Sequence, residues 1–287
     1  MSKVEIQGWK MYYRTTRPTT APHEEVDITP VLNGQIWKIG KTGNHPILAR
    51  WTSNFDCGYK TEWWYCIEDE PFSLEDVKAK KRYYIKKGLE NFDVRVINPS
   101  EYIEELFVVA TEAYKNYSSA LIDKSCKAKE IFEREICRTD IITFGAFEKQ
   151  NNQLLCGYAN VKIYDSYADF MTLKVIPKYE KRQINAALIF GILDYLKDKL
   201  GNGYYLSDGM RNILHETNFQ NYLISYFGFR LAYCNLHIAY RPLLRPIINI
   251  LYIFRDVCYK LKNNKYMSKI CAILCMEEIA RSCQKGK

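Results

Sequence analysis

The residues best suited to move a proton lie just after a short strand-like run over 204–207. Asp208 precedes Gly209, and His215 follows in the same loop. A carboxylate or an imidazole can take a proton from an amine, and the ordinary pKa of histidine is close to neutral pH. We therefore expect Asp208 to act as a base or to orient an amine, with His215 as a second candidate. An aspartate in a turn and a histidine at a helix entry are the equally simple structural interpretation.

The elements that would position these groups follow from the hydrophobic pattern. Alternation predicts a strand over Tyr167–Val175, and helical spacing predicts a helix over Ala186–Leu200. The same patterns predict helices from Ser100 and over 127–138 and 219–227, and strands over 139–149, 153–163 and 230–240. A turn at 149–152 joins two of these strands as a hairpin. This order predicts an α+β fold with a mixed, mostly antiparallel sheet flanked by helices.

The rest of the sequence is strand-rich at its beginning and basic at its end. Strands are predicted over Gln7–Tyr13, Gln35–Ile39 and Thr61–Ile67, and a basic helix is predicted from Ser73 to Gly88. We therefore expect three regions. They are an N-terminal strand-rich region with the basic helix over 1–98, a central domain over 99–242, and a basic amphipathic helical tail over 243–287.

The stretch Val175-Ile-Pro177-Lys-Tyr179 ends a strand and leads through a basic loop into a helix, and Asn218 and Gly228-Phe229 follow. This order and spacing resemble the acyl-CoA-binding core of GNAT-type acyltransferases. In that family a helix N-terminus holds the pyrophosphate of the donor. The resemblance implies acetyl-CoA or another acyl-CoA as co-substrate. It also implies donor contacts from Leu173, Val175, Lys181, Arg182, Gln183, Asn185, Ala186 and Asn218.

Two positions depart from the family pattern. Gln183 and Asn185 stand where the phosphate loop has glycines, and their side chains would crowd the phosphates. The tyrosine that protonates the leaving thiolate in many relatives corresponds to Ile224 here. Tyr226 lies nearby in the same predicted helix, and we keep it as a candidate acid.

The segment Lys80–Ile97 combines a helix rich in Lys and Arg with a short strand, and a helix follows from Glu101. It resembles the segment that opens the transferase domain of Fem-type peptidyltransferases, a GNAT-fold branch without the usual glycine loop. The resemblance covers residues 75–240. It implies transfer of an acetyl or aminoacyl group, from acyl-CoA or aminoacyl-tRNA, to an amino group of a cell-envelope sugar or precursor.

Positive charge is concentrated at the end of the sequence. After Tyr240, ten Lys and Arg residues stand against three Asp and Glu residues, which accounts for +7 of the formal net charge of +8. A nearly neutral body disfavours DNA binding, whereas a basic tail favours contact with an anionic membrane surface. The polar N-terminus lacks the apolar run of a secretory signal, so we expect a cytoplasmic, membrane-peripheral protein. The spacing of Cys and His matches no zinc pattern, and no metal is expected.

Two other functions stay open on the sequence alone. Loss of the glycines and of the tyrosine is also what a catalytically inactive scaffold would show, bound at a membrane-associated envelope-polysaccharide assembly. A third interpretation is an RNA-binding protein that uses Lys78–Lys87 and the basic tail. A deep pocket at Asp208, His215 and the 170–175 strand would favour an enzyme, and a filled cleft would favour a scaffold.

Overall fold

The computed structural model describes residues 5–40, 44–114, 126–150, 153–213 and 218–285. The chain divides into two compact units. Unit 1 consists of Met1–Tyr65, Met210–Thr217 and Leu231–Lys287, and unit 2 consists of Cys66–Gly209 and Asn218–Arg230. These limits differ from the expected boundaries at 98/99 and 242/243. The basic helix and the strand after it belong to unit 2, because they pack against another helix and another strand of that unit.

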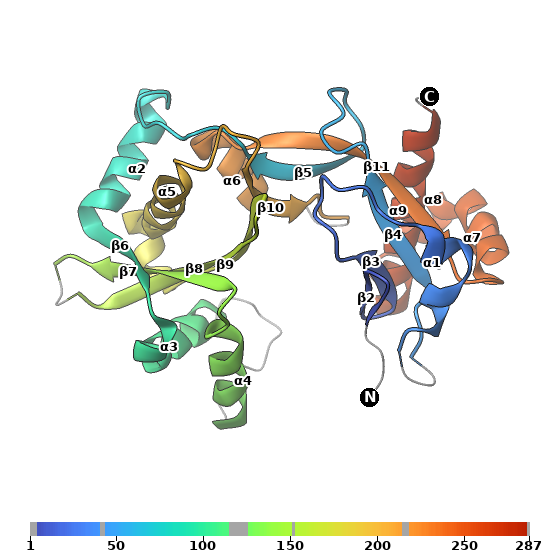
Figure 1. Cartoon of the computed structure of the whole chain (residues 1–287), viewed down its shortest axis with the longest axis horizontal. Coiled ribbons are helices and arrows are strands. Elements are labelled where there is room, and N and C mark those ends of the chain that lie inside the picture. Colours follow the sequence, from blue (N-terminus) through green and yellow to red (C-terminus); the bar gives the residue numbers. More distant parts are fainter. Residues whose placement is uncertain (1–4, 41–43, 115–125, 151–152, 214–217, 286–287) are drawn as a thin grey trace. The chain divides into compact units, whose positions relative to one another are not determined.

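The strands of unit 2 lie in the order β10-β9-β8-β7-β6 (Figure 1). Neighbours are antiparallel, except that β9 and β10 run parallel. The elements of this unit are α2 (Ala79–Asn91), β6 (Phe92–Ile97), η2 (Pro99–Glu101), α3 (Ile103–Tyr114), α4 (Cys126–Ile136), β7 (Ile141–Glu148), β8 (Leu155–Ile163), β9 (Tyr167–Val175), η3 (Pro177–Arg182), α5 (Ile184–Leu196), β10 (Tyr205–Met210) and α6 (Asn218–Phe227). The last residue of β10 is counted with unit 1.

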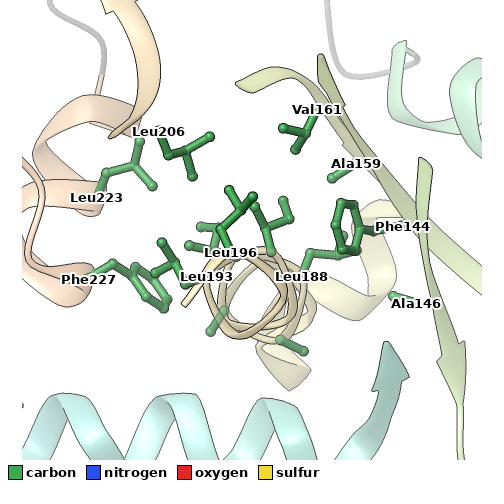
Figure 2. Close-up of a cluster of buried hydrophobic side chains, with 14 of the residues drawn as sticks. Phe144, Ala146, Ala159, Val161, Leu188, Leu193, Leu196, Leu206, Leu223 and Phe227 are labelled. Atoms are coloured by element: carbon green, nitrogen blue, oxygen red, sulfur yellow. The ribbon is translucent and has the colours of Figure 1, made fainter. Parts of the chain in front are cut away.

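Neighbouring residues of the unit 2 sheet face two separate cores. Ala146 of β7 belongs to the core around α5, whereas Phe147, the next residue, belongs to the core formed with α3 and α4. Successive side chains of a strand point to opposite faces, so α5 covers one face of the sheet and α3 covers the other. Figure 2 shows Leu188, Leu193 and Leu196 of α5 gathered in the first of these cores.

Gly88 lets α2 approach the start of α5. A Cβ atom added there would lie 2.5 Å from the carbonyl oxygen of Gln183 and 3.2 Å from the backbone nitrogen of Ala187. Backbone atoms cannot yield as a flexible side chain does. Gly88→Ala should therefore lower the free energy of unfolding by about 1–3 kcal/mol, although alanine is the better helix former. In urea unfolding, a loss no larger than that of the exposed control Lys86→Ala would contradict this close packing.

The strands of unit 1 lie in the order β1-β2-β3-β4-β11. β4 and β11 pair antiparallel, and β3 and β4 pair parallel. The elements of this unit are β1 (Glu5–Ile6), β2 (Trp9–Tyr12), β3 (Thr15–Pro18), α1 (Thr29–Leu32), η1 (Gln35–Lys38), β4 (Leu48–Ser53), β11 (Arg230–Tyr240), α7 (Leu244–Ile253), α8 (Arg255–Lys260) and α9 (Lys265–Lys285), together with the first half of β5 (Trp63–Glu68).

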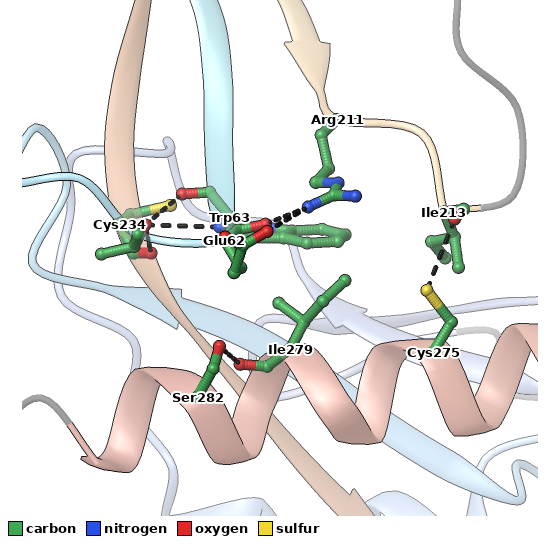
Figure 3. A network of polar contacts seen from close by, with 9 residues as sticks. Glu62, Trp63, Arg211, Ile213, Cys234, Cys275, Ile279 and Ser282 are labelled. Carbon is green, nitrogen blue, oxygen red and sulfur yellow. Dashed lines mark hydrogen bonds and ion pairs between the residues drawn. The ribbon is translucent and has the colours of Figure 1, made fainter. Parts of the chain in front are cut away.

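The segment at the end of β10, residues 210–213, is held inside unit 1 by side-chain contacts. Arg211 donates a hydrogen bond to the carbonyl oxygen of Glu62 (Figure 3). Its guanidinium lies 4.6 Å from the centre of the Trp64 ring. The Sγ atom of Cys275 in α9 donates to the carbonyl oxygen of Ile213. Residues 210–213 are thereby tied to both β5 and α9.

The basic tail forms α7, α8 and α9. The last two pack together through Cys258, Cys271 and Leu274. α7 buries Ile248 but leaves a row of apolar side chains in solvent, which are those of Ile247, Ile250 and Ile253. Among the helices of the described ranges, none is both long and apolar enough to cross a membrane.

Two predicted elements were wrong. Gln35–Lys38 is a 3₁₀ helix rather than a strand, because Gly34 has a left-handed backbone and three-residue spacing brings both Ile36 and Ile39 into the core. The basic helix begins at Ala79 rather than at Ser73 and continues to Asn91. Gly88 is an interior contact point of this helix and does not end it.

Candidate functional site

β9 and β10 separate partway along their length. Their parallel pairing runs from Tyr205–Tyr167 to Ser207–Asp169 and, in these fully described strands, goes no further. A cavity of about 460 Å³ lies against the residues beyond that point. Its lining includes Phe170–Val175 of β9, Asp208 of β10, Asn185 of α5 and Phe219 of α6. The cavity, which we call the donor cleft, is therefore formed within unit 2 by two diverging strands.

A β-bulge in β9 faces this cleft. Asn160 of β8 is opposite Thr172, and Val161 is opposite Phe170, so Met171 is an extra residue without a partner in the ladder. Met171 also lines the donor cleft. A bulge leaves the backbone of its extra residue unpaired and is common beside active sites. Met171 thus has no partner in the ladder between β8 and β9, at a point where β9 lines the cleft.

Asp208 is the titratable carboxylate that β10 places in the cleft. Burial raises its pKa to about 7, and a hydrogen bond from Gln220 acts in the opposite direction. Gln220 belongs to α6 and is itself buried. A carboxyl group with a pKa near 7 exchanges protons readily at neutral pH, which is the property required of a general base.

The start of α5 forms the end of the cleft where phosphates would bind. Gln183 has φ +67° and ψ 34°, the left-handed conformation that glycine adopts at no cost, although it carries a full side chain. Within the described ranges, no side chain caps the first turn of α5. The Oδ1 atom of Asn185 is buried without a hydrogen-bond partner in the described part of the chain. These free polar groups suit a ligand, whereas Glu180 in the same lining would repel a phosphate.

Of the eight predicted donor contacts, Leu173, Val175 and Asn185 line the cleft. Gln183 is half-buried just outside the lining, and the side chains of Lys181 and Asn218 are exposed. The remaining two residues, Arg182 and Ala186, do not line the cleft.

Arg182 and Ala186 are directed away from the cleft. Arg182 forms an ion pair with Glu148, donates to Asn91 and stacks near Phe92. Ala186 is fully buried in the core around α5. The ion pair of Arg182 anchors the loop between η3 and α5 to β7 and to the end of α2, so this arginine positions the loop.

Tyr226, the candidate acid, lies at another place in unit 2 than Asp208. Tyr226 lines a second cavity, of about 660 Å³, together with Glu68, Lys81 and Ile224. Its ring lies 4.8 Å from that of Tyr222 and 5.4 Å from the Lys81 ammonium. Tyr226 therefore does not line the donor cleft. His215 lies outside the described residues.

Several lining residues were not singled out from the sequence. Lys174, Glu180 and Ala113 contribute to the cleft with Met171 and Phe219. The two-residue period of β9 predicted which of its side chains share a face of the sheet. The bulge at Met171 changes that assignment, and no residue type in the sequence marks it. Among the described residues, no group of three or more His, Cys, Asp and Glu side chains is placed to hold a metal ion.

No protein-family model matches the chain, and no curated protein sequence matches it. Among solved structures, the chain is similar to the PaiA N-acetyltransferase of Thermoplasma acidophilum in complex with coenzyme A, at 25% identity, covering 38% of this chain and 73% of that one with a TM-score of 0.29. It is also similar to L-PGS from Bacillus licheniformis, at 13% identity, covering 86% and 84% with a TM-score of 0.49. FemX is 8% identical, covering 65% of this chain and 63% of that one, with a TM-score of 0.47.

These TM-scores are below 0.5, so the assignment of the fold rests on the topology of the chain itself. The antiparallel run β6-β7-β8-β9 is followed by α5 and then by β10, which lies parallel to β9 and diverges from it around a cavity. Unit 2 therefore has a GNAT-like fold, with helices on both faces of a mixed, mostly antiparallel sheet.

Proposed function

We propose that this chain is an acyltransferase that binds its acyl donor between β9 and β10 and transfers the acyl group to an amine. The observation that carries the proposal is the donor cleft itself, which is open and which contains a half-buried carboxyl group, Asp208, with a pKa near 7. A filled space between the two strands would have favoured a scaffold. The cleft therefore supports the enzymatic interpretation.

Asp208 is assigned the proton transfers of the reaction. As the amine nitrogen attacks the acyl carbon, a C–N bond forms and the Asp208 carboxylate takes the proton that the nitrogen loses. The backbone at the Met171 bulge donates to the acyl oxygen while negative charge develops there. The bond from the acyl carbon to the leaving sulfur or oxygen then breaks, and Asp208 returns its proton to that atom.

The donor is proposed to be an acyl-CoA, with an aminoacyl-tRNA as the second candidate. The uncapped start of α5 and the side chain of Lys174 are positive features beside the cleft, and they favour a donor with phosphates. Glu180 and the side chain of Gln183 oppose a close approach of those phosphates. Because these features act in opposite directions, donor binding is measured directly for each class of donor.

The acceptor is proposed to be an amino group of an amino sugar or another cell-envelope precursor, reached at an anionic membrane surface. The basic tail supports this placement, since Lys and Arg close to a membrane are attracted to anionic lipid. The apolar row on α7, formed by Ile247, Ile250 and Ile253, is suited to the interfacial layer. On this proposal the protein works in the cytoplasm, peripheral to the membrane.

The proposal is tested by following acyl transfer with the full chain. Acetyl-CoA, longer acyl-CoA esters and aminoacyl-tRNA are offered with amino-sugar nucleotides as acceptors, and the free thiol or the deacylated tRNA is measured. We expect turnover with one donor class. Absence of both turnover and donor binding would instead support the alternative, an inactive scaffold at an envelope-polysaccharide assembly.

Gln183→Gly tests whether the phosphates of an acyl-CoA donor bind at the start of α5. Glycine removes the side chain from a left-handed position and frees the backbone for phosphates, so acyl-CoA should bind about 3- to 10-fold more tightly. The dissociation constant is measured by calorimetry. Gln153→Gly is the matched control, because Gln153 is another glutamine of unit 2 with positive φ and does not line the cleft. Unchanged affinity in Gln183→Gly would argue against phosphates at the start of α5.

A further inference from the structure

Two arginines lie side by side in unit 1, far along the chain from the residues of the donor cleft. Thr16 of β3 pairs with Ala49 of β4, and Arg17 and Arg50 are the next residues of these two parallel neighbours. Both arginines line one small cavity. The fold therefore brings two positive side chains to a single place.

Neither guanidinium has a carboxylate partner among the described residues. Arg50 is only 7% exposed, and its hydrogen bond is donated by Nη1 to the sulfur of Met276 at 3.5 Å. The Nε atoms of Arg17 and Arg50 are buried and lack a hydrogen-bond partner in the described part of the chain. Both guanidinium groups also lie near aromatic rings, at 5.7 Å from the Tyr12 ring centre for Arg17 and 5.6 Å from the Trp63 ring centre for Arg50.

Such an arrangement is unfavourable without an anion. Burial, and then repulsion by Arg17, lower the pKa of Arg50 to about 10, but the group is still charged at neutral pH. Tyr65 cannot neutralise it, because burial raises the pKa of the Tyr65 hydroxyl to about 12 and keeps it protonated. A buried charge that lacks a partner destabilises a fold strongly, and here two like charges share one cavity.

The cavity itself has the size and the donors for one small ion. Its volume is about 80 Å³, which exceeds the ~10–15 Å³ needed by one water. Thr20, Thr52 and Tyr65 line it together with the two arginines. The Tyr65 and Thr52 hydroxyls are hydrogen-bonded to each other at 3.3 Å, so both are close enough together to donate to one ligand.

We propose that this cavity, which lies against β3 and β4 in unit 1, is a binding site for a single phosphate group. Two guanidinium forks with adjacent hydroxyls offer more donors than the two oxygens of a carboxylate can accept, whereas the oxygens of a phosphate match them. A phosphate monoester also carries nearly two negative charges at pH 7, which equals the charge of the two arginines. The site is independent of the proposed acyl transfer.

The test measures binding by the full chain at constant ionic strength in chloride buffer. The ligands are inorganic phosphate, glycerol 3-phosphate and acetate. We expect saturating phosphate or glycerol 3-phosphate to raise the melting temperature by about 5 °C, and acetate to have little effect. Tighter binding of glycerol 3-phosphate would identify an esterified phosphate as the occupant, and tighter binding of inorganic phosphate would identify the free ion.

Arg50→Met should weaken phosphate binding at least ~10-fold, as measured by calorimetry, because it removes a charge-assisted donor. In phosphate-free buffer the same variant should melt at the same temperature as the original protein or at a higher one, because an unpaired buried charge has been removed. Arg14→Met is the control, since Arg14 is exposed in the turn between β2 and β3 and does not line the cavity. Arg17→Met repeats the binding test if Arg50→Met does not fold.

Three results would overturn the proposal. These are a phosphate effect of equal size in Arg50→Met, an equal effect of acetate, or no effect of any anion on the original protein. The first result would reflect the general stabilisation that excluded salts give to any folded chain. Because the measurement is of binding, its outcome does not depend on whether an acyl donor is turned over.

Discussion

Asp208→Asn should lower kcat for acyl transfer by about 10²–10⁴-fold. Asparagine has nearly the same shape as aspartate but cannot take a proton, so the donor should still bind while the amine is no longer deprotonated. The dissociation constant of the donor is therefore expected to change little. This combination, a lost rate with retained binding, assigns Asp208 to the chemistry and not to the shape of the cleft.

The pH profile gives a second measure of the same role. Because the pKa of Asp208 is raised to about 7, the fraction of active carboxylate increases as pH rises through 7. The rate of the original protein should therefore rise across pH 6–8 and then level, and the residual rate of Asp208→Asn should not show this step.

As pH rises through 7, the contribution of Asp208 to the free energy of unfolding should fall while the rate increases. A raised carboxyl pKa favours the folded state at pH values below the ordinary value of 3.8, and this contribution is lost as pH rises through 7. Asp208→Asn, which cannot ionise, should thus be at least as stable as the original protein at pH 8. A lost rate in a variant of undiminished stability cannot be ascribed to unfolding.

Asp169→Asn is the matched control for Asp208. Asp169 is on the neighbouring strand β9, burial raises its pKa to about 6, and it does not line the donor cleft. We expect kcat to stay within about threefold of the original value. Equal losses in the two variants, or full activity of Asp208→Asn, would contradict the assignment of Asp208 as the base.

Leu188→Ala should lower the free energy of unfolding by about 2–5 kcal/mol. Leu188 is fully buried in α5, in the core that α5 forms with the sheet (Figure 2). Truncation removes buried apolar surface and leaves a cavity that close-packed neighbours fill only in part. The effect should appear in unit 2, where this core lies.

The measurement can distinguish the two units. All five tryptophans, at positions 9, 37, 51, 63 and 64, belong to unit 1, so tryptophan fluorescence follows that unit. Far-ultraviolet circular dichroism follows the helices and strands of both. We expect Leu188→Ala to lower the urea midpoint seen by circular dichroism. Leu154→Ala, at a position 41% exposed, should leave it nearly unchanged, and similar losses in both variants would contradict the position of Leu188 in the core.

The sequence predicted the long strands of both units well because strands and helices differ clearly in period. β9 has the predicted limits, Tyr167–Val175, and β11 has the predicted limits, Arg230–Tyr240. β9 has nine residues and β11 has eleven, and strands of that length show the pattern with little ambiguity. Gln35–Lys38 has only four residues, about one helical repeat, so the turn at Gly34 decided its structure.

The candidate site was predicted only where position along a strand determines position in space. Asp208 follows the paired part of β10 directly, and it lines the cleft; its role as a base stays a prediction. Arg182 was expected at a phosphate because of its charge, but the buried Glu148 on a distant strand is its partner. Such a pairing depends on tertiary contacts, as does the bulge at Met171. Tyr226 is on the predicted helix α6 but lines another cavity.

The division of the chain has a consequence for the order in which the protein folds during synthesis. Unit 1 needs β4, from residues 1–65, and β11 and α9, which are synthesised after unit 2. Almost all of unit 2 is synthesised between these two parts, so its core can close while Trp63 and Leu48 still lack Leu236 and Ile279. Apolar surface of β4 and β5 must therefore stay unpaired until β11 and α9 have been synthesised, and chains that terminate before α9 would expose it to aggregation.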